Sequence, residues 1–580
     1  MLDSTSVSEA HAAPGQTSRL RPPAKISWAI LIAATLYVCY FSHLGPIGFV
    51  GPDEPRYAWI ARAMAETGDW VTPRLYGQPW FEKPPLFYWG AAVSFKLFGV
   101  SEAAARLPSA ICALLATLAM AWLAWRLYAA ETARWLLLLL PTTVGMIGFS
   151  HAAATDMPFS GMLTVAMVCA AVVLRLDGAA QGGASHSPLE VAGSTPVRKT
   201  PWRALLLFGF FLGLAVLAKG PAGIVLCGGA VFFWALFTKR WRDAFRLLHP
   251  AAIATFCATA LPWYILCARR NPDFFRIFIV EHNFKRFLTP EFQHIQPFWF
   301  YVPVLLAALF PWTFLLASAV YAASLKLWRT RRLSDSRWFL LCWAAFTVFF
   351  FTISRSKLPG YVLPAVAPAA LAVTHFAVST CANVNRARWL LSVSGLFSAA
   401  AGFLAGYFSD AAPYVTDARP PAGPAQFGAI AIAGGIAALG LALFRRPRAS
   451  LAATTLMVLG LMTLDTGDLW QLDEGVSARR AVDIALEHMT PEQSAAATVF
   501  KLRRAYKYQV DFYLHRETQE WSPNAKEHSI VFTDYKNSAE FVRLGGWCPP
   551  YIAFPAVWVC EDAKDGQILM HHAAGSGQPQ

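Results

Sequence analysis

The chain has 580 residues, of which 56% are hydrophobic and only 14% charged, and its formal net charge is +14. A soluble protein usually carries about 25% charged residues, so this composition excludes an ordinary soluble domain and predicts a polytopic α-helical membrane protein. In a soluble protein the positive charge would suggest a nucleic-acid partner. Here we interpret it as cytoplasmic anchoring and attraction to anionic lipid, with no nucleic acid involved.

Residues 1–24 are polar and rich in Ser, Pro and Ala, which predicts a disordered cytoplasmic segment. No small-residue cleavage site follows the first apolar run, so we expect a retained helix and not a signal peptide. Residues 25–465 contain repeated apolar runs whose length matches a bilayer, and they predict about thirteen transmembrane helices. The expected spans lie near residues 26–43, 103–125, 135–149, 158–174, 204–217, 221–237, 251–267, 298–325, 338–353, 359–379, 389–408, 426–444 and 451–465.

Every second loop between these runs is short and rich in Arg and Lys, as in residues 239–246 and 326–337. The positive-inside rule makes these loops cytoplasmic. An odd number of spans then places the C-terminus outside. For a bacterial chain this predicts an inner-membrane protein with its C-terminal region in the periplasm.

Two outward loops are long. The first, about 44–102, mixes Trp and Tyr with charged residues, which is typical of short helices lying in the membrane interface. The other, about 268–297, carries Arg269 and Arg270 near its start. Positive charge on the translocated side runs against the topology trend, and an anionic ligand would explain it.

Residues 466–580 lose the apolar runs and predict a small periplasmic α/β domain. We expect helices near 473–489, 505–515 and 537–544, and strands near 498–502, 529–533, 556–560 and 567–570. Cys548 and Cys560 lie in this domain. They form either a disulfide, which an oxidising compartment permits, or two buried free thiols.

Acidic residues at the outward ends of the spans are the first candidates for function, because a charge near lipid needs a partner, a wet cavity or a role. Asp53 follows Pro52, and Asp156 precedes Met157-Pro158. Each has a structural alternative as a helix cap. Glu82-Lys83, which precede two prolines, are either a surface ion pair or part of a site.

Three further positions carry open alternatives. Lys219 precedes Gly220-Pro221 and is either functional or a polar hinge between spans. Lys357 is either functional or a boundary residue that extends toward water. His282 and His294 can join Glu82, Asp53 or Glu281 in a divalent metal site, although no spacing motif demands one.

Several sequence blocks together carry a family resemblance. They are Asp53-Glu54-Pro55-Arg56-Tyr57-Ala58, Phe81-Glu82-Lys83-Pro84-Pro85-Leu86, Ala105-Arg106-Leu107-Pro108-Ser109, Thr155-Asp156-Met157-Pro158, Ala218-Lys219-Gly220-Pro221, Glu281-His282-Asn283, Pro297-Phe298-Trp299-Phe300-Tyr301 and Ser356-Lys357-Leu358-Pro359-Gly360-Tyr361. In this order, over about residues 50–365, they resemble the polyprenyl-phosphate-dependent glycosyltransferases of the GT-C fold, which include protein O-mannosyltransferases. The match is strongest to the bacterial 4-amino-4-deoxy-L-arabinose transferases that modify lipid A.

The resemblance implies a function. Such a protein moves aminoarabinose from undecaprenyl phosphate to a lipid A phosphate, lowers the negative charge of the cell surface and gives polymyxin resistance. The implied partners are this lipid-linked donor, lipid A and the membrane, and we expect a monomer. A related transferase that moves another sugar to protein or glycan is the alternative enzyme. A lipid or sugar transporter is the non-enzyme alternative, but transporters favour midplane charges and repeated halves.

The resemblance also implies site residues. The expected catalytic carboxylates are Asp53, Asp156 and Glu82. The expected residues for the donor and its phosphate are Lys83, Arg56, Tyr57, Arg269, Arg270, Lys357 and Tyr361. Asp156 and Glu82 would orient Lys83 and Arg56 or bind a metal ion.

The acceptor decides the role of Asp53. Attack on the sugar passes through a cationic, oxocarbenium-like state. A phosphate acceptor is already anionic and needs no base, so Asp53 would steady positive charge on the sugar. A hydroxyl acceptor would make Asp53 the general base.

Overall fold

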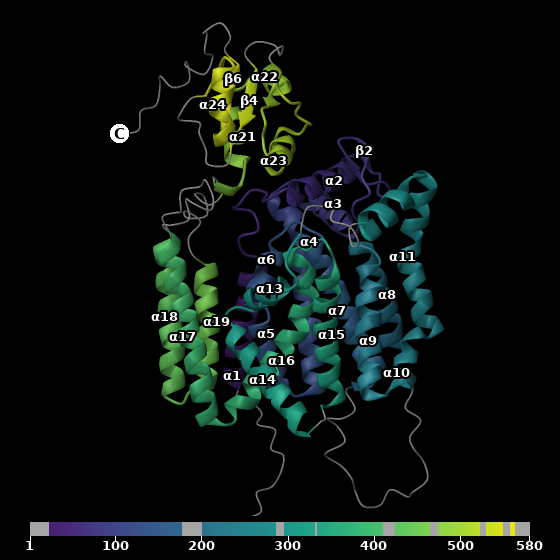
Figure 1. The fold of residues 1–580 in the computed structure, drawn as a ribbon, viewed down its shortest axis with the longest axis vertical. Coiled ribbons are helices and arrows are strands. Elements are labelled where there is room, and N and C mark those ends of the chain that lie inside the picture. Colours follow the sequence, from purple (N-terminus) through teal and green to yellow (C-terminus); the bar gives the residue numbers. More distant parts are fainter. Residues whose placement is uncertain are drawn as a thin grey trace, which may run out of the picture.

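The computed structural model describes residues 22–176, 200–285, 295–330, 333–409, 424–463, 473, 475–522, 529–548 and 557–562. The disorder expected for residues 1–24 falls almost wholly outside these ranges, as does the boundary expected at residue 466. Within them the chain is mainly helical and carries one α/β unit at its C-terminal end (Figure 1).

A large helical bundle forms the body of the protein. Its helices are α1 (Pro22–Tyr40), α4 (Glu102–Leu127), α5 (Ala130–Leu139), α6 (Val144–Ser150), α7 (Asp156–Val173), α8 (Trp202–Lys219), α9 (Ala222–Thr238), α10 (Trp241–Phe245), η2 (Arg246–Leu248), α11 (Pro250–Arg270), α13 (Tyr301–Ala308), α14 (Thr313–Thr330), α15 (Asp335–Ile353), η4 (Pro359–Val362), α16 (Leu363–Cys381), α17 (Val384–Ser409), α18 (Pro424–Leu443) and α19 (Pro447–Met462). Helices suit these sequences because lipid offers no partners for backbone N–H and C=O groups. Each expected span falls on one of these helices or on a consecutive pair.

The number of spans is only partly established. Among the described residues, eight helices are long and apolar enough to cross a membrane, or up to ten if α5–α6 and α13–α14 are each one bent span. The remaining expected spans correspond to shorter apolar helices, α1, α9 and α19. The protein is therefore a multi-pass membrane protein, and the count of about thirteen stays a prediction.

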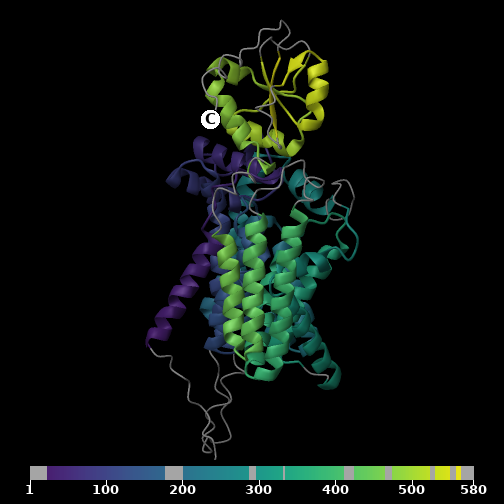
Figure 2. The ribbon, with the colours of Figure 1, turned by 90° about the vertical axis from the view of Figure 1, so that its left-hand side faces the viewer.

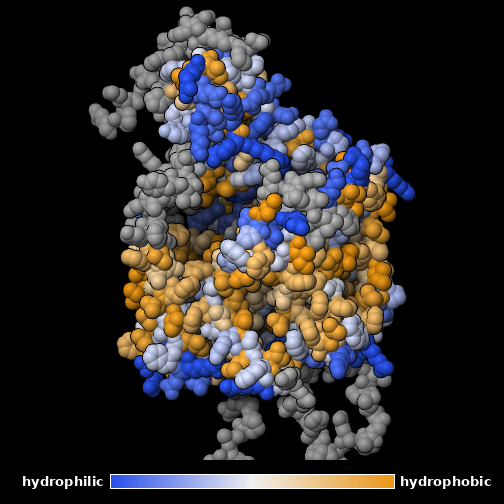
Figure 3. Space-filling model, in the orientation of Figure 1, coloured by the Kyte–Doolittle hydropathy of each residue, from blue (hydrophilic) through white to orange (hydrophobic). Residues whose placement is uncertain are grey.

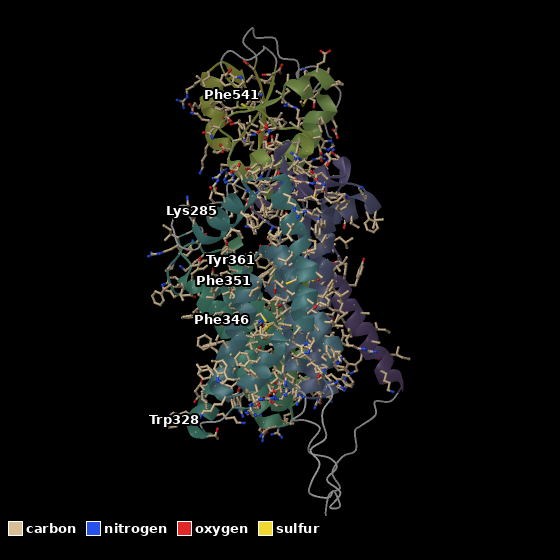
Figure 4. The ribbon with its side chains drawn as sticks, turned by 90° about the vertical axis from the view of Figure 1, so that its right-hand side faces the viewer. Lys285, Trp328, Phe346, Phe351, Tyr361 and Phe541 are labelled. Carbon is tan, nitrogen blue, oxygen red and sulfur yellow. A yellow bond between two sulfur atoms is a disulfide. The ribbon has the colours of Figure 1, made fainter. Side chains whose placement is uncertain are left out.

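The bundle has polar ends and an apolar middle. Figure 3 shows a hydrophobic band around the helices, with hydrophilic surface at one end and over the C-terminal domain at the other. Trp328 of α14 lies at the end away from that domain, in the expected cytoplasmic stretch 326–337 (Figure 4). Helix α1 runs obliquely along one side of the bundle (Figure 2). The basic loops and the C-terminal domain thus lie at opposite ends, as the alternating charges predict.

Between the bundle and the C-terminal domain lies a layer made from the first outward loop (Figure 1). It contains α2 (Asp53–Thr67), α3 (Leu86–Phe98) and a two-stranded antiparallel hairpin of β1 (Arg74–Leu75) and β2 (Gln78–Pro79). Helix α2 ends at Gly68, whose φ of 74° is left-handed and favours glycine. The expected short helices are thus present, and their place in the membrane interface stays a prediction. We call this layer, residues 44–101, the interface layer.

The C-terminal unit is an α/β domain, as predicted. Its helices are α21 (Arg479–His488), α22 (Pro491–Ala496), α23 (Arg504–Leu514) and α24 (Tyr535–Arg543), and its strands are β3 (Thr498–Val499), β4 (Ile530–Thr533), β5 (Gly546–Trp547) and β6 (Trp558–Asp562). The sheet order is β3-β4-β6-β5, with β3 parallel to β4 and the other pairs antiparallel. Cys548 and Cys560 form a disulfide, so the free-thiol alternative is wrong. The sequence prediction missed α22 and β5, and the strand expected at 567–570 lies outside the described residues.

One buried ion pair fixes the start of the interface layer. Arg106 of α4 contacts both carboxylate oxygens of Glu54 at 2.8 and 3.2 Å, and both side chains are under 10% exposed. Arg106 also donates to the carbonyls of Leu44, Ile47 and Gly48. A single side chain therefore satisfies a stretch of chain that has no regular secondary structure.

We expect Glu54→Gln to lower protein stability strongly, because it leaves the Arg106 charge buried without a carboxylate. Breaking such a pair costs about 3–5 kcal/mol. The matched control is Glu66→Gln, which breaks the Arg62–Glu66 pair on α2, where Glu66 is 57% exposed. An exposed pair contributes less than about 1 kcal/mol. Thermal unfolding of the purified protein measures both, and equal effects would contradict the assigned role of Glu54.

Candidate active site

The first charged cluster joins the beginning of α2 to the Glu82-Lys83 segment before α3. Arg56 Nη2 lies 2.5 Å from Asp53 Oδ1 and 2.9 Å from Glu82 Oε2. Lys83 Nζ lies 3.3 Å from Glu82 Oε1. Four of the expected site residues therefore form one alternating chain of charges, Asp53–Arg56–Glu82–Lys83, which we call the first cluster.

Exposure distinguishes the two carboxylates of the first cluster. The Asp53 side chain is 48% exposed, whereas Glu82 is 9% and Arg56 5% exposed. Burial by itself disfavours the charged guanidinium, but Glu82 and Asp53 outweigh it and raise the pKa of Arg56 above its ordinary value. Arg56 thus stays cationic. Glu82 is buried between the two cations, whereas the carboxylate of Asp53 is open to solvent.

Neither Asp53 nor Asp156 caps its helix through the side chain. The capping positions are Pro52 and Thr155, and neither helix start has a side-chain cap hydrogen bond. Asp53 and Asp156 are instead the first helical residues of α2 and α7. The capping alternative is therefore wrong for both residues, and their carboxylates form ion pairs.

A second cluster surrounds Asp156. Lys219 Nζ, at the end of α8, lies 2.5 Å from Asp156 Oδ1 and 4.4 Å from the centre of the Tyr361 ring. A Cβ on Gly360 would lie 2.5 Å from Asp156 Oδ1, so a larger residue there would displace the Asp156 carboxylate. The partner of Asp156 is thus Lys219, and not Lys83 or Arg56 as the sequence interpretation had it. Lys219, for which a functional role and a polar hinge were both open, thus forms an ion pair.

Hydrogen bonds between side chains and backbone groups link the chain segments that carry the two clusters. Ala153 N, three residues before Asp156, donates to Glu54 Oε1 at 2.6 Å, and Glu54 neighbours Asp53. Ser109 of α4 donates to the carbonyl of Ala152 at 2.7 Å. One buried carboxylate therefore sets the position of both acidic segments.

The other expected phosphate ligands lie in different surroundings. Lys357 is buried and donates to the Ser354 carbonyl at 2.8 Å, and burial together with the nearby Arg355 lowers its pKa. Arg269 is exposed at the end of α11, and Arg270 beside it pairs with Asp69 of the interface layer at 3.1 Å. Tyr57 is 2% exposed and packs on the Tyr88 ring inside the interface layer. Tyr57 therefore belongs to the packing beneath Arg56.

Figure 4 places Tyr361 and Lys285 on the side of the bundle nearer to the C-terminal domain, with Phe351 just below Tyr361. The Tyr361 and Phe351 ring centres are 4.9 Å apart. Phe81, the residue before Glu82, packs on Phe274 at 5.3 Å. Phe274, which follows α11, therefore packs against the segment that carries Glu82 and Lys83.

The expected metal site does not fit the residues as they stand. Asp53 and Glu82 are both bonded to Arg56. Within the described ranges, no three His, Cys, Asp or Glu side chains are grouped to hold a metal ion. His282 lies in the π-helical segment η3 (Arg276–Lys285), and His294 is outside the described residues. A metal ion stays a prediction, and no step below depends on it.

The sequence interpretation included Arg56 among the site residues but missed Trp80 and Tyr88 beside it. Arg56 Nε, Trp80 Nε1 and Tyr88 Oη are buried and have no hydrogen-bond partner among the described residues. Such buried donors need an acceptor, and a polar ligand or water satisfies them. The only sequence signal was the aromatic content of the first outward loop, which was interpreted as membrane anchoring.

Comparison with known proteins bears on the fold and the family of the chain. A family model described as dolichyl-phosphate-mannose-protein mannosyltransferase matches residues 26–278. A crystal structure of ArnT from Cupriavidus metallidurans bound to undecaprenyl phosphate superposes with a TM-score of 0.72 and 21% identity, covering 96% of this chain and 99% of that one. At this identity the likeness shows the fold.

Curated relatives carry the family assignment. An undecaprenyl phosphate-α-4-amino-4-deoxy-L-arabinose arabinosyl transferase of Photorhabdus laumondii is 30% identical over 65% of this chain and 64% of its own length, so that match spans less than two thirds of the relative. The protein of the same name from Pseudomonas aeruginosa is 30% identical over 87% of this chain and 88% of its own length. The chain therefore belongs to the family of undecaprenyl phosphate-α-4-amino-4-deoxy-L-arabinose arabinosyl transferases.

Proposed function

We propose that the protein is an inner-membrane glycosyltransferase that moves 4-amino-4-deoxy-L-arabinose from undecaprenyl phosphate to a phosphate of lipid A at the periplasmic face. The added amine lowers the negative charge of the cell surface and gives resistance to polymyxin. The observation that carries the proposal is the first cluster. It combines a half-exposed carboxylate, Asp53, with cations that a buried carboxylate holds in place at one end of the bundle.

The reaction replaces one phosphate with another at the anomeric carbon. The bond from that carbon to the undecaprenyl phosphate oxygen breaks, and its electron pair leaves with the phosphate. An oxygen of the acceptor phosphate forms the new bond. Because this oxygen is already anionic, no proton has to be removed, and Asp53 steadies the positive charge that develops on the sugar.

The cations hold two phosphates close together. Lys83 and Lys219 are each fixed by a carboxylate, at 3.3 and 2.5 Å, so their ammonium groups are positioned before a ligand arrives. Lys357 contributes a third ammonium group, bonded only to a backbone carbonyl among the described residues. Fixed cations that neutralise a leaving phosphate lower the barrier without reorganising.

The direct test is mass spectrometry of lipid A from cells with and without the gene, followed by transfer with purified protein and synthetic donor. A mass increase of one aminopentose on a lipid A phosphate supports the proposal. A hexose on protein or glycan, or no addition in either assay, overturns it.

We expect Lys83→Ala to raise KM for the donor about 10- to 100-fold, the cost of losing one charge-assisted contact to phosphate. Lys83→Arg keeps the charge and should recover part of the affinity. Lys96→Ala is the control, because Lys96 lies at the end of α3 against the Trp70 ring, away from the first cluster. Unchanged donor affinity in Lys83→Ala would remove Lys83 from the site.

We expect Asp53→Asn and Asp156→Asn to change different kinetic constants. Asp53→Asn should lower kcat about 100- to 1,000-fold, because the charge opposite the cationic sugar is lost. Asp156→Asn releases Lys219 and should mainly raise KM for the donor, as Lys219→Ala should. Steady-state kinetics separate the two effects. Wild-type kcat in Asp53→Asn would contradict the role given to Asp53.

Lys357 predicts an alkaline limit to donor use. Its lowered pKa means that the ammonium is lost at a lower pH than in an ordinary lysine, so kcat/KM should fall on the alkaline side before an ordinary lysine would titrate. Lys357→Arg keeps its charge at higher pH and should move this decline upward. The pH profile of kcat/KM is measured for the wild type and for Lys357→Arg. The same decline in both proteins would exclude Lys357 from donor binding.

A further inference from the structure

The C-terminal domain reaches the first cluster through α23. Arg56 lies within reach of three aromatic rings, with its guanidinium carbon 5.3 Å from the centre of Tyr57, 5.6 Å from Trp80 and 5.7 Å from Tyr508. Tyr57 and Trp80 belong to the interface layer. Tyr508 belongs to the C-terminal domain, so part of the surroundings of Arg56 comes from a different domain.

Tyr508 has two further contacts that hold its ring in place. Its ring stacks on Tyr76 of the interface layer, with centres 6.4 Å apart and planes 26° apart. Arg504, one helical turn earlier, lies 5.4 Å from the ring centre and donates to the Tyr508 hydroxyl at 3.3 Å. A ring fixed in this way can restrict the orientation of a guanidinium group.

Separate contacts dock the domain, so Tyr508 is not needed for that purpose. Tyr76 donates to Asp511 at 2.5 Å, and Gly48 N donates to Asp473 at 2.6 Å. Tyr513 donates to Glu102 at 2.9 Å and accepts from Phe49 N. These bonds are polar and partly or fully buried, whereas the contact between Tyr508 and Arg56 is a face-on approach of a ring to a cation.

We propose that Tyr508 is a positioning residue of the active site, which holds the Arg56 guanidinium in the orientation that bridges Asp53 and Glu82. The C-terminal domain is then part of the catalytic unit. The inference rests on the proposed function, since the effect of Tyr508 on the site is measured as the rate of sugar transfer. Its physical content is the coupling between Tyr508 and Arg56.

The experiment uses the full-length protein in lipid or detergent with the synthetic donor and lipid A. Tyr508→Leu removes the ring and should lower kcat about tenfold, the size expected of a desolvated cation–π contact. Tyr508→Phe keeps the ring, loses only the bond from Arg504 and should transfer sugar like wild type. Tyr535→Leu is the matched control, because Tyr535 is 59% exposed on α24 and packs on Trp558 of the same domain.

Two results would overturn the proposal on activity. One is wild-type kcat in Tyr508→Leu. The other is an equal loss in Tyr508→Phe or Tyr535→Leu, which would point to general loosening of the domain. Val510→Ala serves as a standard for such loosening, because Val510 is fully buried in the domain core.

A double-mutant cycle gives a reading that does not need activity. Tyr508→Leu and Arg56→Ala, alone and together, are compared by thermal unfolding. If the ring acts on Arg56, the shift in Tm caused by Tyr508→Leu should shrink by at least about half once Arg56 is absent. Additive shifts would overturn the inference. An inactive wild-type protein would overturn the proposed function while this cycle still decides the role of Tyr508.

Discussion

The geometry of the site depends on the buried pair of Glu54 and Arg106. A charge inside a low-dielectric region must be paired, and breaking the pair is costly. Arg106 uses its remaining donors on the carbonyls of Leu44, Ile47 and Gly48, and Glu54 accepts from Val50 N and Ala153 N. Together these bonds join three separate stretches of the chain, which are residues 44–54, the start of α4 at Arg106, and the segment at Ala153. The pair therefore fixes where α2 and α7 begin, and both helices begin at an acidic residue of the site.

The adjacent carboxylates of Asp53 and Glu54 consequently have different roles. Successive residues on a helix point about 100° apart, so Glu54 turns into the protein while Asp53 turns outward, where it is 48% exposed. Glu82 is buried like Glu54 and holds Arg56 and Lys83. A substrate can approach Asp53 without disturbing the carboxylates that hold the structure together.

The sequence predicts the parts of this protein that local physics determines. The spans follow from the length and polarity that a bilayer demands, and Asp53, Glu82 and Lys83 stand out because charges beside lipid are costly. Contacts between distant segments are not encoded locally. The bond between Asp156 and Lys219 joins residues 63 positions apart, and nothing in Ala218-Lys219-Gly220 distinguishes an ion-pair partner from a hinge. The approach of Tyr508 to Arg56 depends on how two domains dock, and strand β5 is only two residues long.

Charge balance indicates how the site accommodates a phosphate. In the first cluster Asp53 and Glu82 offset Arg56 and Lys83, and in the second cluster Asp156 offsets Lys219. Two neutral clusters attract an anion only through the orientation of their cations. Lys357 differs, because among the described residues it bonds to the Ser354 carbonyl and has no carboxylate partner. Burial and the neighbouring Arg355 both disfavour its charge, as its lowered pKa reflects. Under the proposed function, a donor phosphate beside Lys357 would offset this charge, whereas Arg56, Lys83 and Lys219 already have carboxylate partners.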